Sequence, residues 1–224
     1  ISFHDWHPDL ILPGKNTWLT TKNSQLWKHN DVCNDYCKYY GTNYPFEIEI
    51  PASTGQTVTT LKSIEYILES YKRAEFNCFD QFHVLDYNFD QAIIYNSEQI
   101  SGYLNLNIFP KNNIVLAQQY PKINVDSIDI LVSKEEQKYR FNQFWDVTQN
   151  RGEFDPTVSN SIFLTRLNGY IRDLNAANLN YNKSALQRKK FRHYYNKVIL
   201  RRDFSGNRKM IMKLANTKMN YSYR

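Results

Sequence analysis

The sequence predicts a mainly β protein, built from sandwich-like antiparallel sheets with a few short helices. Several segments alternate apolar and polar residues with period two, as strands with one buried face do. Turn signals recur about every 8–12 residues, which is the spacing typical of all-β domains. The composition agrees with this fold class, because the 224 residues include 17 tyrosines and only 7 glycines, and tyrosine favours strands.

The first segment, residues 1–75, is expected to form short strands separated by tight turns. Asp9–Pro13 is an apolar run that ends in the turn signal Pro13-Gly14. Residues 17–21 and 25–29 flank a short polar turn at Lys22-Asn23-Ser24. Two strand-like runs around such a turn predict a β-hairpin.

Two longer strands are expected in the same segment. Residues 44–51 alternate, with three apolar residues on one face and two glutamates on the other: Phe46, Ile48 and Ile50 against Glu47 and Glu49. Residues 57–70 are rich in β-branched residues, but their alternation breaks near Ile67 and Leu68. A helix is possible there, and we favour a strand with a bulge.

Residues 76–132 form the second segment, in which we expect β-hairpins. Three strands are predicted, His83–Asp86, Ala92–Asn96 and Gly102–Ile108, with turns rich in Asn, Asp and Ser between them. The last of these strands alternates leucine and isoleucine with asparagine. Residues 111–124 read as a polar connection bounded by prolines.

The third segment, residues 133–224, is expected to combine strands, an irregular loop and a terminal hairpin. Near its start, Phe141, Phe144 and Trp145 allow one or two helical turns, although the alternation through Tyr139 also allows a strand. Residues 150–184 carry repeated turn signals and predict an ordered loop. Residues 192–204 and 208–218 are predicted to pair as a hairpin through Ser205-Gly206-Asn207.

The chain is mildly basic, with 28 Lys and Arg against 22 Asp and Glu, a net charge of +6. Much of the excess lies between residues 187 and 213. This balance permits contact with nucleic acid or an acidic protein surface, and equally an edge strand guarded by basic residues. Three cysteines are an odd number in a chain of this size, so we expect assembly in a reducing cytoplasm. No apolar run approaches the ~20 residues that span a bilayer.

One possible metal site lies at the start of the sequence. His4 and His7 stand beside Asp5 and Asp9, and imidazole with carboxylate is a ligand set for Zn²⁺ or Fe²⁺. Because Pro8 restricts the backbone at His7, the two rings need not converge. A packed loop is the simpler interpretation.

A second possible metal site combines His29, Cys33 and Cys37, which only Cys78 could complete. Structural zinc sites usually use cysteines two to four residues apart with a second pair further on. This spacing is incomplete, so buried thiols are the simpler interpretation. We therefore expect no bound metal and no cofactor.

Recognised catalytic motifs are absent from the sequence, including the nucleophile elbow, the phosphate-binding loop, the dinucleotide fingerprint and the zinc-protease helix. We expect no enzyme activity. Two alternatives stay open: a receptor- or glycan-binding module that uses surface aromatic residues, and a metal-dependent hydrolase built on His4 and His7.

Three stretches resemble the C-terminal part of a virion protein of crAss-like bacteriophages, namely residues 92–107, 136–154 and 188–224. The family is the tail muzzle, the counterpart of the nozzle in other short-tailed phages. Residues 2–30, 39–50 and 61–70 are also similar to the propeller-type blade pattern of such tail proteins, so the 1–75 segment is propeller-blade-like. These motifs are structural signatures, and the resemblance supplies no active-site residues.

The resemblance implies a β-rich subunit of a homo-oligomeric ring in the phage tail, assembled in the cytoplasm of the bacterial host. The ring would form the outlet through which DNA and cargo proteins leave, next to ring and portal-adjacent proteins and tail fibres. Family members are far longer and residue 1 is Ile, so we expect part of a larger subunit.

The resemblance to a tail outlet also leads to an expectation about four basic residues. A channel that passes DNA should bind phosphates weakly, because phosphate contacts made by Lys and Arg would retard the DNA. We therefore expect the basic side chains near the C-terminal end to face neighbouring subunits, solvent or another protein: Lys189, Lys190, Arg201 and Arg202.

Overall fold

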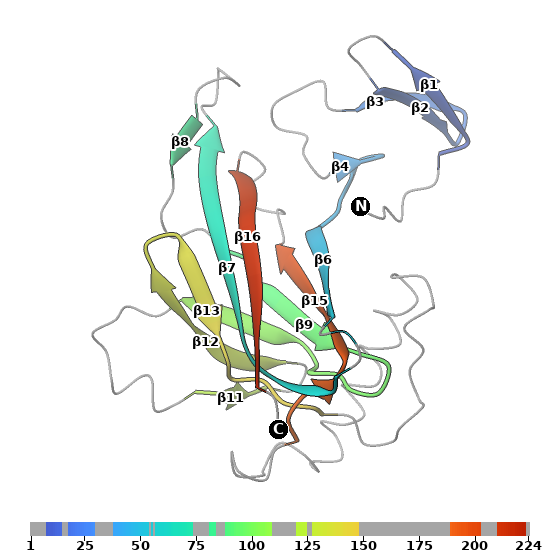
Figure 1. Cartoon of the computed structure of the whole chain (residues 1–224). Helices are drawn as coiled ribbons and strands as arrows, with labels where there is room; N and C mark the ends of the chain where they lie inside the picture. Colours follow the sequence, from blue (N-terminus) through green and yellow to red (C-terminus); the bar gives the residue numbers. More distant parts are fainter. Residues whose placement is uncertain are drawn as a thin grey trace.

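The protein is mainly β, and the part of the chain that the structure describes contains no helix (Figure 1). The computed structural model describes residues 8–14, 18–29, 38–53, 55, 57–73, 81–83, 88–108, 120–124, 127–147, 189–202 and 210–222. The strands are β1 Leu10–Pro13, β2 Trp18–Lys22, β3 Gln25–His29, β4 Lys38–Tyr39, β5 Thr42–Asn43, β6 Phe46–Ser53, β7 Thr59–Arg73, β8 Gln81–His83, β9 Gln91–Tyr95, β10 Leu104–Ile108, β11 Lys122–Ile123, β12 Ile128–Glu135, β13 Lys138–Phe141, β14 Arg192–His193, β15 Tyr195–Arg202 and β16 Met210–Ser222.

The N-terminal strands form a separate antiparallel sheet of order β1-β2-β3. The predicted hairpin is confirmed, because Lys22 pairs with Gln25 across a two-residue turn. Asn23 and Ser24 have φ angles of 52° and 60°, the left-handed pair that matches the twist of a hairpin. A second small hairpin, β4-β5, turns at Tyr40 and Gly41.

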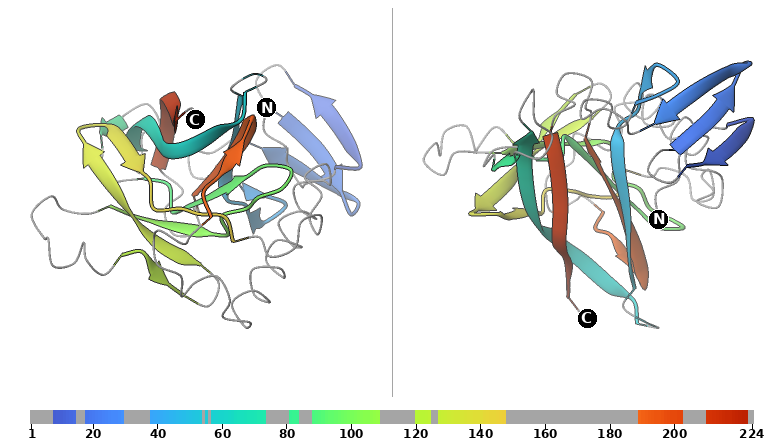
Figure 2. Two further views of the ribbon diagram at one scale, coloured as in Figure 1. Left: turned by 60° about the horizontal axis from the view of Figure 1, so that its bottom comes forward. Right: turned by 90° about the horizontal axis from the view of Figure 1, so that it is seen from above.

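The other strands form one sheet of eleven strands that curls into a half-barrel (Figure 2). Its main path runs β14-β7-β13-β12-β10-β9-β15-β6, and β16 pairs along the opposite edge of β7. The sheet takes strands from all three segments that the sequence delimits. Within the described residues, the outer edges of β6 and β16 pair with no further strand.

The long strand β7 confirms the choice of a strand over a helix for residues 57–70. A register shift occurs at the predicted place, opposite Ile67 and Leu68, and a second one occurs within β7. Ser63 and Leu61 are paired with consecutive residues of β16, so the additional residue of β7 is Lys62. Opposite Ile67 and Leu68 the additional residue belongs to β16. Side chains therefore keep alternating through Ile64, Tyr66 and Leu68, all of them buried.

The expectation of purely antiparallel sheets is wrong at one pair of strands. β10 and β12 run parallel, with Leu104 beside Ile128 and Ile108 beside Val132. A parallel pair needs a crossover connection of about a dozen residues or more. Residues 109–127 provide that length, and their short strand β11 pairs antiparallel with β12.

The predicted terminal hairpin is also wrong. Both of its strands exist as β15 and β16, but they do not pair with each other. β15 lies between β6 and β9, which occupy both of its edges. β16 instead extends along β7. Val198, Ile199 and Leu200 are buried on both faces of β15, as suits a strand in the middle of a sheet.

Two smaller predictions are resolved by the same sheet. Residues 138–141 form β13 and no helical turn follows, so the strand alternative is confirmed for Tyr139 and Phe141. Of the strand predicted at His83–Asp86, His83 ends β8, which pairs with the end of β7, and residues 84–86 lie outside the described residues. The predicted loop at 150–184, the turn at 205–207 and residues 111–119 of the polar connection lie outside the described residues.

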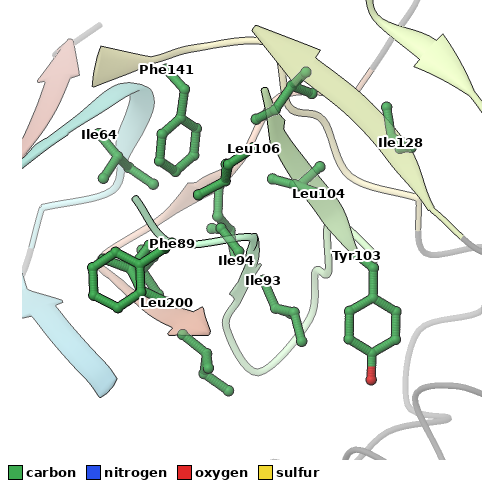
Figure 3. Close-up of a cluster of buried hydrophobic side chains, with 14 of the residues drawn as sticks. Ile64, Phe89, Ile93, Ile94, Tyr103, Leu104, Leu106, Ile128, Phe141 and Leu200 are labelled. Atoms are coloured by element: carbon green, nitrogen blue, oxygen red, sulfur yellow. The ribbon is translucent and has the colours of Figure 1, made fainter. Parts of the chain in front are cut away.

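The core fills the concave face of the half-barrel (Figure 3). It collects the inward side chains of β7, β9, β10, β12, β13 and β15. The alternation predicted for β10 is confirmed, because Leu104 and Leu106 are buried while Asn105 and Asn107 are half-buried. Ile48 and Ile50 of β6 pack against this core from its edge. Burial of such side chains stabilises the fold by about 1.5–3 kcal/mol each.

Candidate functional site

One face of the N-terminal sheet is closed by an aromatic cluster centred on His29. The His29 side chain is buried, and its Nε2 lies 2.7 Å from the Oγ1 of Thr20. The Thr20 hydroxyl also lies 2.8 Å from the phenol oxygen of Tyr40. Rings of Trp18, Tyr39 and Tyr40 lie 5.4–5.8 Å from the imidazole. Burial lowers the pKa of His29 below its ordinary value, which favours the neutral ring.

Tyr40 explains how this cluster is held. Its φ of 51° lies in the left-handed region, which costs about 1–3 kcal/mol for a residue of this kind. The turn places the Tyr40 ring 5.5 Å from Trp27 and 5.4 Å from His29. The Lys22 ammonium also lies 4.6 Å from the centre of that ring. In the described part of the chain His29 is therefore a packing residue.

Of the possible metal ligands, only Asp9 and His29 lie within the described residues. No group of three or more His, Cys, Asp or Glu residues capable of holding a metal ion exists among the described residues. Asp9 accepts a hydrogen bond from the backbone N–H of Asn23 at 3.2 Å. His4, His7 and Asp5 lie outside the described residues, as do Cys33, Cys37 and Cys78.

A serine–histidine pair that the sequence did not indicate occurs near the start of β15. The Ser97 hydroxyl lies 3.3 Å from Nε2 of His193, a contact that resembles a nucleophile and its base. The backbone N–H of Tyr195 donates to Nδ1 of His193 at 3.3 Å. Nδ1 therefore carries the lone pair and Nε2 carries the proton, so the imidazole donates to Ser97. This tautomer cannot accept the serine proton.

No hydrogen bond or ion pair joins His193 to a carboxylate among the described residues. Asp146 accepts a hydrogen bond from Gln99 Nε2 at 3.2 Å and another from the backbone N–H of Ile100 at 3.4 Å. Gln99 in turn contacts the start of β14, because its Oε1 accepts from the N–H of Arg192 at 2.7 Å. The arrangement connects strands and lacks the carboxylate–histidine contact that a triad needs.

The convex face of the sheet carries several charged groups that form ion pairs within the chain. Lys197 forms an ion pair with Glu49 at 2.9 Å, and Arg201 with Glu47 at 3.3 Å. Arg202, the next residue of β15, points to the other face, beside Phe46, and contacts Asp90. The predicted alternation of β6 is confirmed, because its glutamates lie on the convex face.

Glu65 is the other centre of charge on this face. Its carboxylate meets Lys138 at 3.0 Å and Arg140 at 3.5 Å. It also accepts a hydrogen bond from Asn220 at 2.8 Å. The hydrogen bond from Lys138 is the main cause that lowers the Glu65 pKa. Lys189 and Lys190 are exposed before β14, and whether they face other subunits stays a prediction.

A shallow groove of about 440 Å³ lies where β12 changes its neighbour from β11 to β13. Gln143 fills the gap in the ladder, because its Oε1 accepts from the N–H of Leu131 at 2.9 Å. No carboxylate or histidine belongs to the groove, which is lined by Leu131, Val132, Ser133, Lys134, Arg140, Asn142 and Gln143. It therefore lacks the acid–base groups of a catalytic pocket.

The second face of the N-terminal sheet is an exposed apolar surface, which we call the leucine face. It comprises Leu10 and Leu12 of β1, Leu19 of β2 and Leu26 of β3. The strand register aligns Leu10 with Thr21 and Leu26, and Leu12 with Leu19 and Lys28. Leu26 is 64% exposed, Leu10 53% and Leu12 39%. These leucines lie on the side of the sheet opposite the buried Thr20 and His29, because alternate residues point to opposite faces.

A second exposed apolar patch, the Tyr194 patch, consists of Val58 and Tyr194. The pairing of Thr59 with His193 brings the residues before β7 and after β14 together. Val58 and Tyr194 are each 46% exposed. The Tyr194 ring is supported by His193 at 4.2 Å and by Tyr195 at 5.1 Å between ring centres. Among the described residues, the exposed large hydrophobic side chains are those of Leu10, Ile11, Leu12, Leu26, Val58 and Tyr194.

Comparison with protein-family models finds no match, and no curated protein is significantly similar to the sequence. The described residues include no helix that is long and apolar enough to cross a membrane.

Proposed function

We propose that this chain is a structural subunit that works through its interfaces and has no reactive centre. The observation that carries this proposal is the pair of exposed apolar patches, the leucine face and the Tyr194 patch. Several charged groups of the convex face are engaged in ion pairs within the chain. Contiguous exposed apolar patches larger than a few hundred Å² often mark interaction sites.

Within that class, we propose a tail muzzle subunit of a crAss-like bacteriophage, which forms the outlet for DNA and cargo proteins. The three stretches that resemble this family support it: residues 92–107, 136–154 and 188–224. In this proposal the described residues are part of a larger subunit, which contains propeller-like or sandwich sheets. The three-stranded N-terminal sheet is of the size expected for a portion of one blade.

A tail outlet must be stiff and must not retain the DNA that passes it. The curled sheet and its filled concave face give stiffness. Arg201, Arg202 and Lys197 are neutralised by Glu47, Asp90 and Glu49, so their capacity to hold phosphates is reduced. This supports the expectation that these basic residues do not act as DNA contacts.

The test uses the phage that encodes the chain. Mass spectrometry of purified virions should identify these residues, and gold-labelled antibodies raised against the chain should mark the distal end of the tail. A conditional deletion of the gene should yield filled heads without a complete tail outlet. Absence of the chain from purified virions, or labelling of the head alone, would exclude the proposal.

A glycan-binding tail module is the second candidate, and one observation favours it. The exposed Tyr194 ring, held by His193 and Tyr195, is the kind of flat aromatic surface on which sugars stack. Binding of host cell-wall glycans by the isolated chain, lost on Tyr194→Ala, would support this candidate over a purely structural role.

A further inference from the structure

The groove beside β12 lies where the ladder between β12 and β13 stops (Figure 1). The last pair of these antiparallel strands is Ser133 with Arg140. The next hydrogen-bonded pair in the same register would place Asn142 opposite Leu131, but β13 ends before it. The N–H of Leu131 instead donates to Oε1 of Gln143 at 2.9 Å. A side chain thus satisfies the donor that a neighbouring strand would normally satisfy.

This arrangement turns one acceptor and two donors toward the groove. The N–H and C=O of one strand residue point to the same edge, so the carbonyl of Leu131 also faces the side that β13 leaves. Among the described residues, no backbone N–H outside the strands donates to that oxygen. Because Oε1 of Gln143 must face the Leu131 N–H, its Nε2 faces away and offers two N–H donors.

Arg140 brings a positive charge to the groove that its own chain uses only in part. Its Nε lies 3.5 Å from Oε1 of Glu65, beyond the usual hydrogen-bond range of about 2.7–3.2 Å. Both oxygens of Glu65 have closer donors, Asn220 at 2.8 Å and Lys138 at 3.0 Å. One carboxylate therefore meets two cations, and among the described residues no other acceptor contacts the Arg140 guanidinium.

The lining favours a negatively charged group on a polypeptide. It contains two cations, two amides and one hydroxyl but no carboxylate, and Leu131 and Val132 add apolar surface. A guanidinium binds carboxylates and phosphates through paired N–H donors. The Leu131 carbonyl decides between them, because a backbone N–H would satisfy this acceptor whereas a phosphate would repel it. The groove of about 440 Å³ is of the size usual for ligand sites, about 300–1,000 Å³.

We infer that this groove binds an extended acidic segment of a partner polypeptide. A glutamate or aspartate carboxylate of the segment pairs with Arg140, and a backbone N–H of the segment donates to the Leu131 carbonyl. Nε2 of Gln143 donates to a carbonyl oxygen of the segment. The segment thereby takes the place that β13 leaves beside β12, a short form of strand addition. The inference goes beyond the proposed function and does not rest on it, because it requires only the groove.

Amide NMR of the isotopically labelled chain, titrated with the peptide acetyl-Val-Glu-Val-amide, tests the inference. The contact is small and exposed, so we expect a Kd of about 1 mM. Saturable shifts should be centred on the amides of residues 131–133 and 140–143. Acetyl-Val-Gln-Val-amide has the same shape without the charge. It should bind at least about tenfold more weakly, because it loses a charge-assisted hydrogen bond.

Lys138 provides a matched control for Arg140. The two side chains are 51% and 53% exposed, lie on the same strand and contact the same carboxylate of Glu65, but only Arg140 lines the groove. Arg140→Gln should weaken binding of the glutamate peptide by about tenfold or more, whereas Lys138→Gln should bind like the wild type. Arg140→Lys keeps the charge but loses the paired donors, so it should also bind more weakly than the wild type.

Thermal unfolding should show that these variants remain folded, because both positions are exposed. Inorganic phosphate is the competing probe: if it shifts the same amides and binds at least as tightly as the glutamate peptide, the assignment to an acidic polypeptide is overturned. Equal weakening by Arg140→Gln and Lys138→Gln, or no saturable shift up to tens of millimolar glutamate peptide, would overturn it as well. Absence of the chain from virions would instead refute the proposed function and leave the titration unchanged.

Discussion

The buried hydrogen bond between Tyr66 and Asn88 should contribute measurably to stability. Tyr66 is 1% exposed, and its hydroxyl donates to Oδ1 of Asn88 at 2.6 Å. Asn88 is 3% exposed, and its Nδ2 already has no partner. Tyr66→Phe would remove the hydroxyl and leave the Asn88 amide without either contact. The ring would remain, together with its stacking on Tyr139 at 5.3 Å.

The magnitude follows from what is lost. No ring volume is removed, so a cavity term does not enter, and the cost is that of a buried acceptor left unsatisfied. We expect a loss of about 1–3 kcal/mol in the free energy of unfolding. For a chain of this size each 1 kcal/mol corresponds to about 2–4 °C in Tm. The denaturant slope should not change.

The burial of Tyr66 also predicts that the folded state loses stability at alkaline pH. Burial raises its pKa far above the ordinary value of 10.0. The folded state therefore keeps the proton that the unfolded state loses, so the stabilisation is present below pH 10 and is lost as pH rises above it. Tyr66→Phe should reduce this dependence while lowering stability at neutral pH.

Urea unfolding at pH 7 and above pH 10 provides the measurement, with a double-mutant cycle on Tyr66→Phe and Asn88→Ala. A coupling of about 1 kcal/mol is expected for residues in direct contact. The control is Tyr71→Phe, which removes the same atom from the same strand, where the hydroxyl donates to Glu69 at 2.8 Å near the surface. If Tyr66→Phe unfolds at the wild-type midpoint, or the cycle shows no coupling, the reasoning fails.

Three further predictions concern the core, the charged face and the aromatic cluster. Phe141→Ala should cost about 3–5 kcal/mol, because its side chain is 1% exposed in the concave core; a urea midpoint near that of the wild type would contradict the assigned packing. Glu65→Gln should cost less than about 1 kcal/mol, because its partners Lys138 and Arg140 are half-exposed. Since the folded pKa of Glu65 is lowered from 4.5, this difference should be present above pH 4.5 and disappear as pH falls below it. Burial lowers the pKa of His29 from 6.5, so the stability of the aromatic cluster should fall as pH drops below 6.5. Tryptophan fluorescence should report this loss of stability. His29→Gln should abolish the pH dependence.

Short-range sequence patterns predict much of the local structure. The alternation of Phe46, Ile48 and Ile50 with two glutamates places β6 and its two faces, because a strand with one buried face must repeat with period two. The turn at Asn23 likewise fixes the hairpin of β2 and β3 through its left-handed backbone. The spacing of the aromatic residues after Phe141 fits a helix and a strand equally, so the sequence did not decide between the two.

Pairing partners are not local, and only the tertiary structure decided them. β15 and β16 are neighbours in the sequence, but β6 and β9 occupy both hydrogen-bonding edges of β15, so no edge of β15 is left for β16. Parallel pairing of β10 and β12 depends equally on how the long connection between them crosses the sheet.

The exposed apolar residues of the leucine face and the Tyr194 patch also depend partly on local sequence and partly on tertiary structure. The leucines are visible in the sequence as apolar strand residues, which most often lie in a core. In the structure Tyr39 and Tyr40 pack beside His29 on the opposite face of the sheet, and these leucines remain exposed. Val58 and Tyr194, distant in the sequence, become one patch only when β14 pairs with β7. Sequence patterns determine which residues form strands, whereas the competition of all strands for edges and for the core determines which apolar surface remains outside.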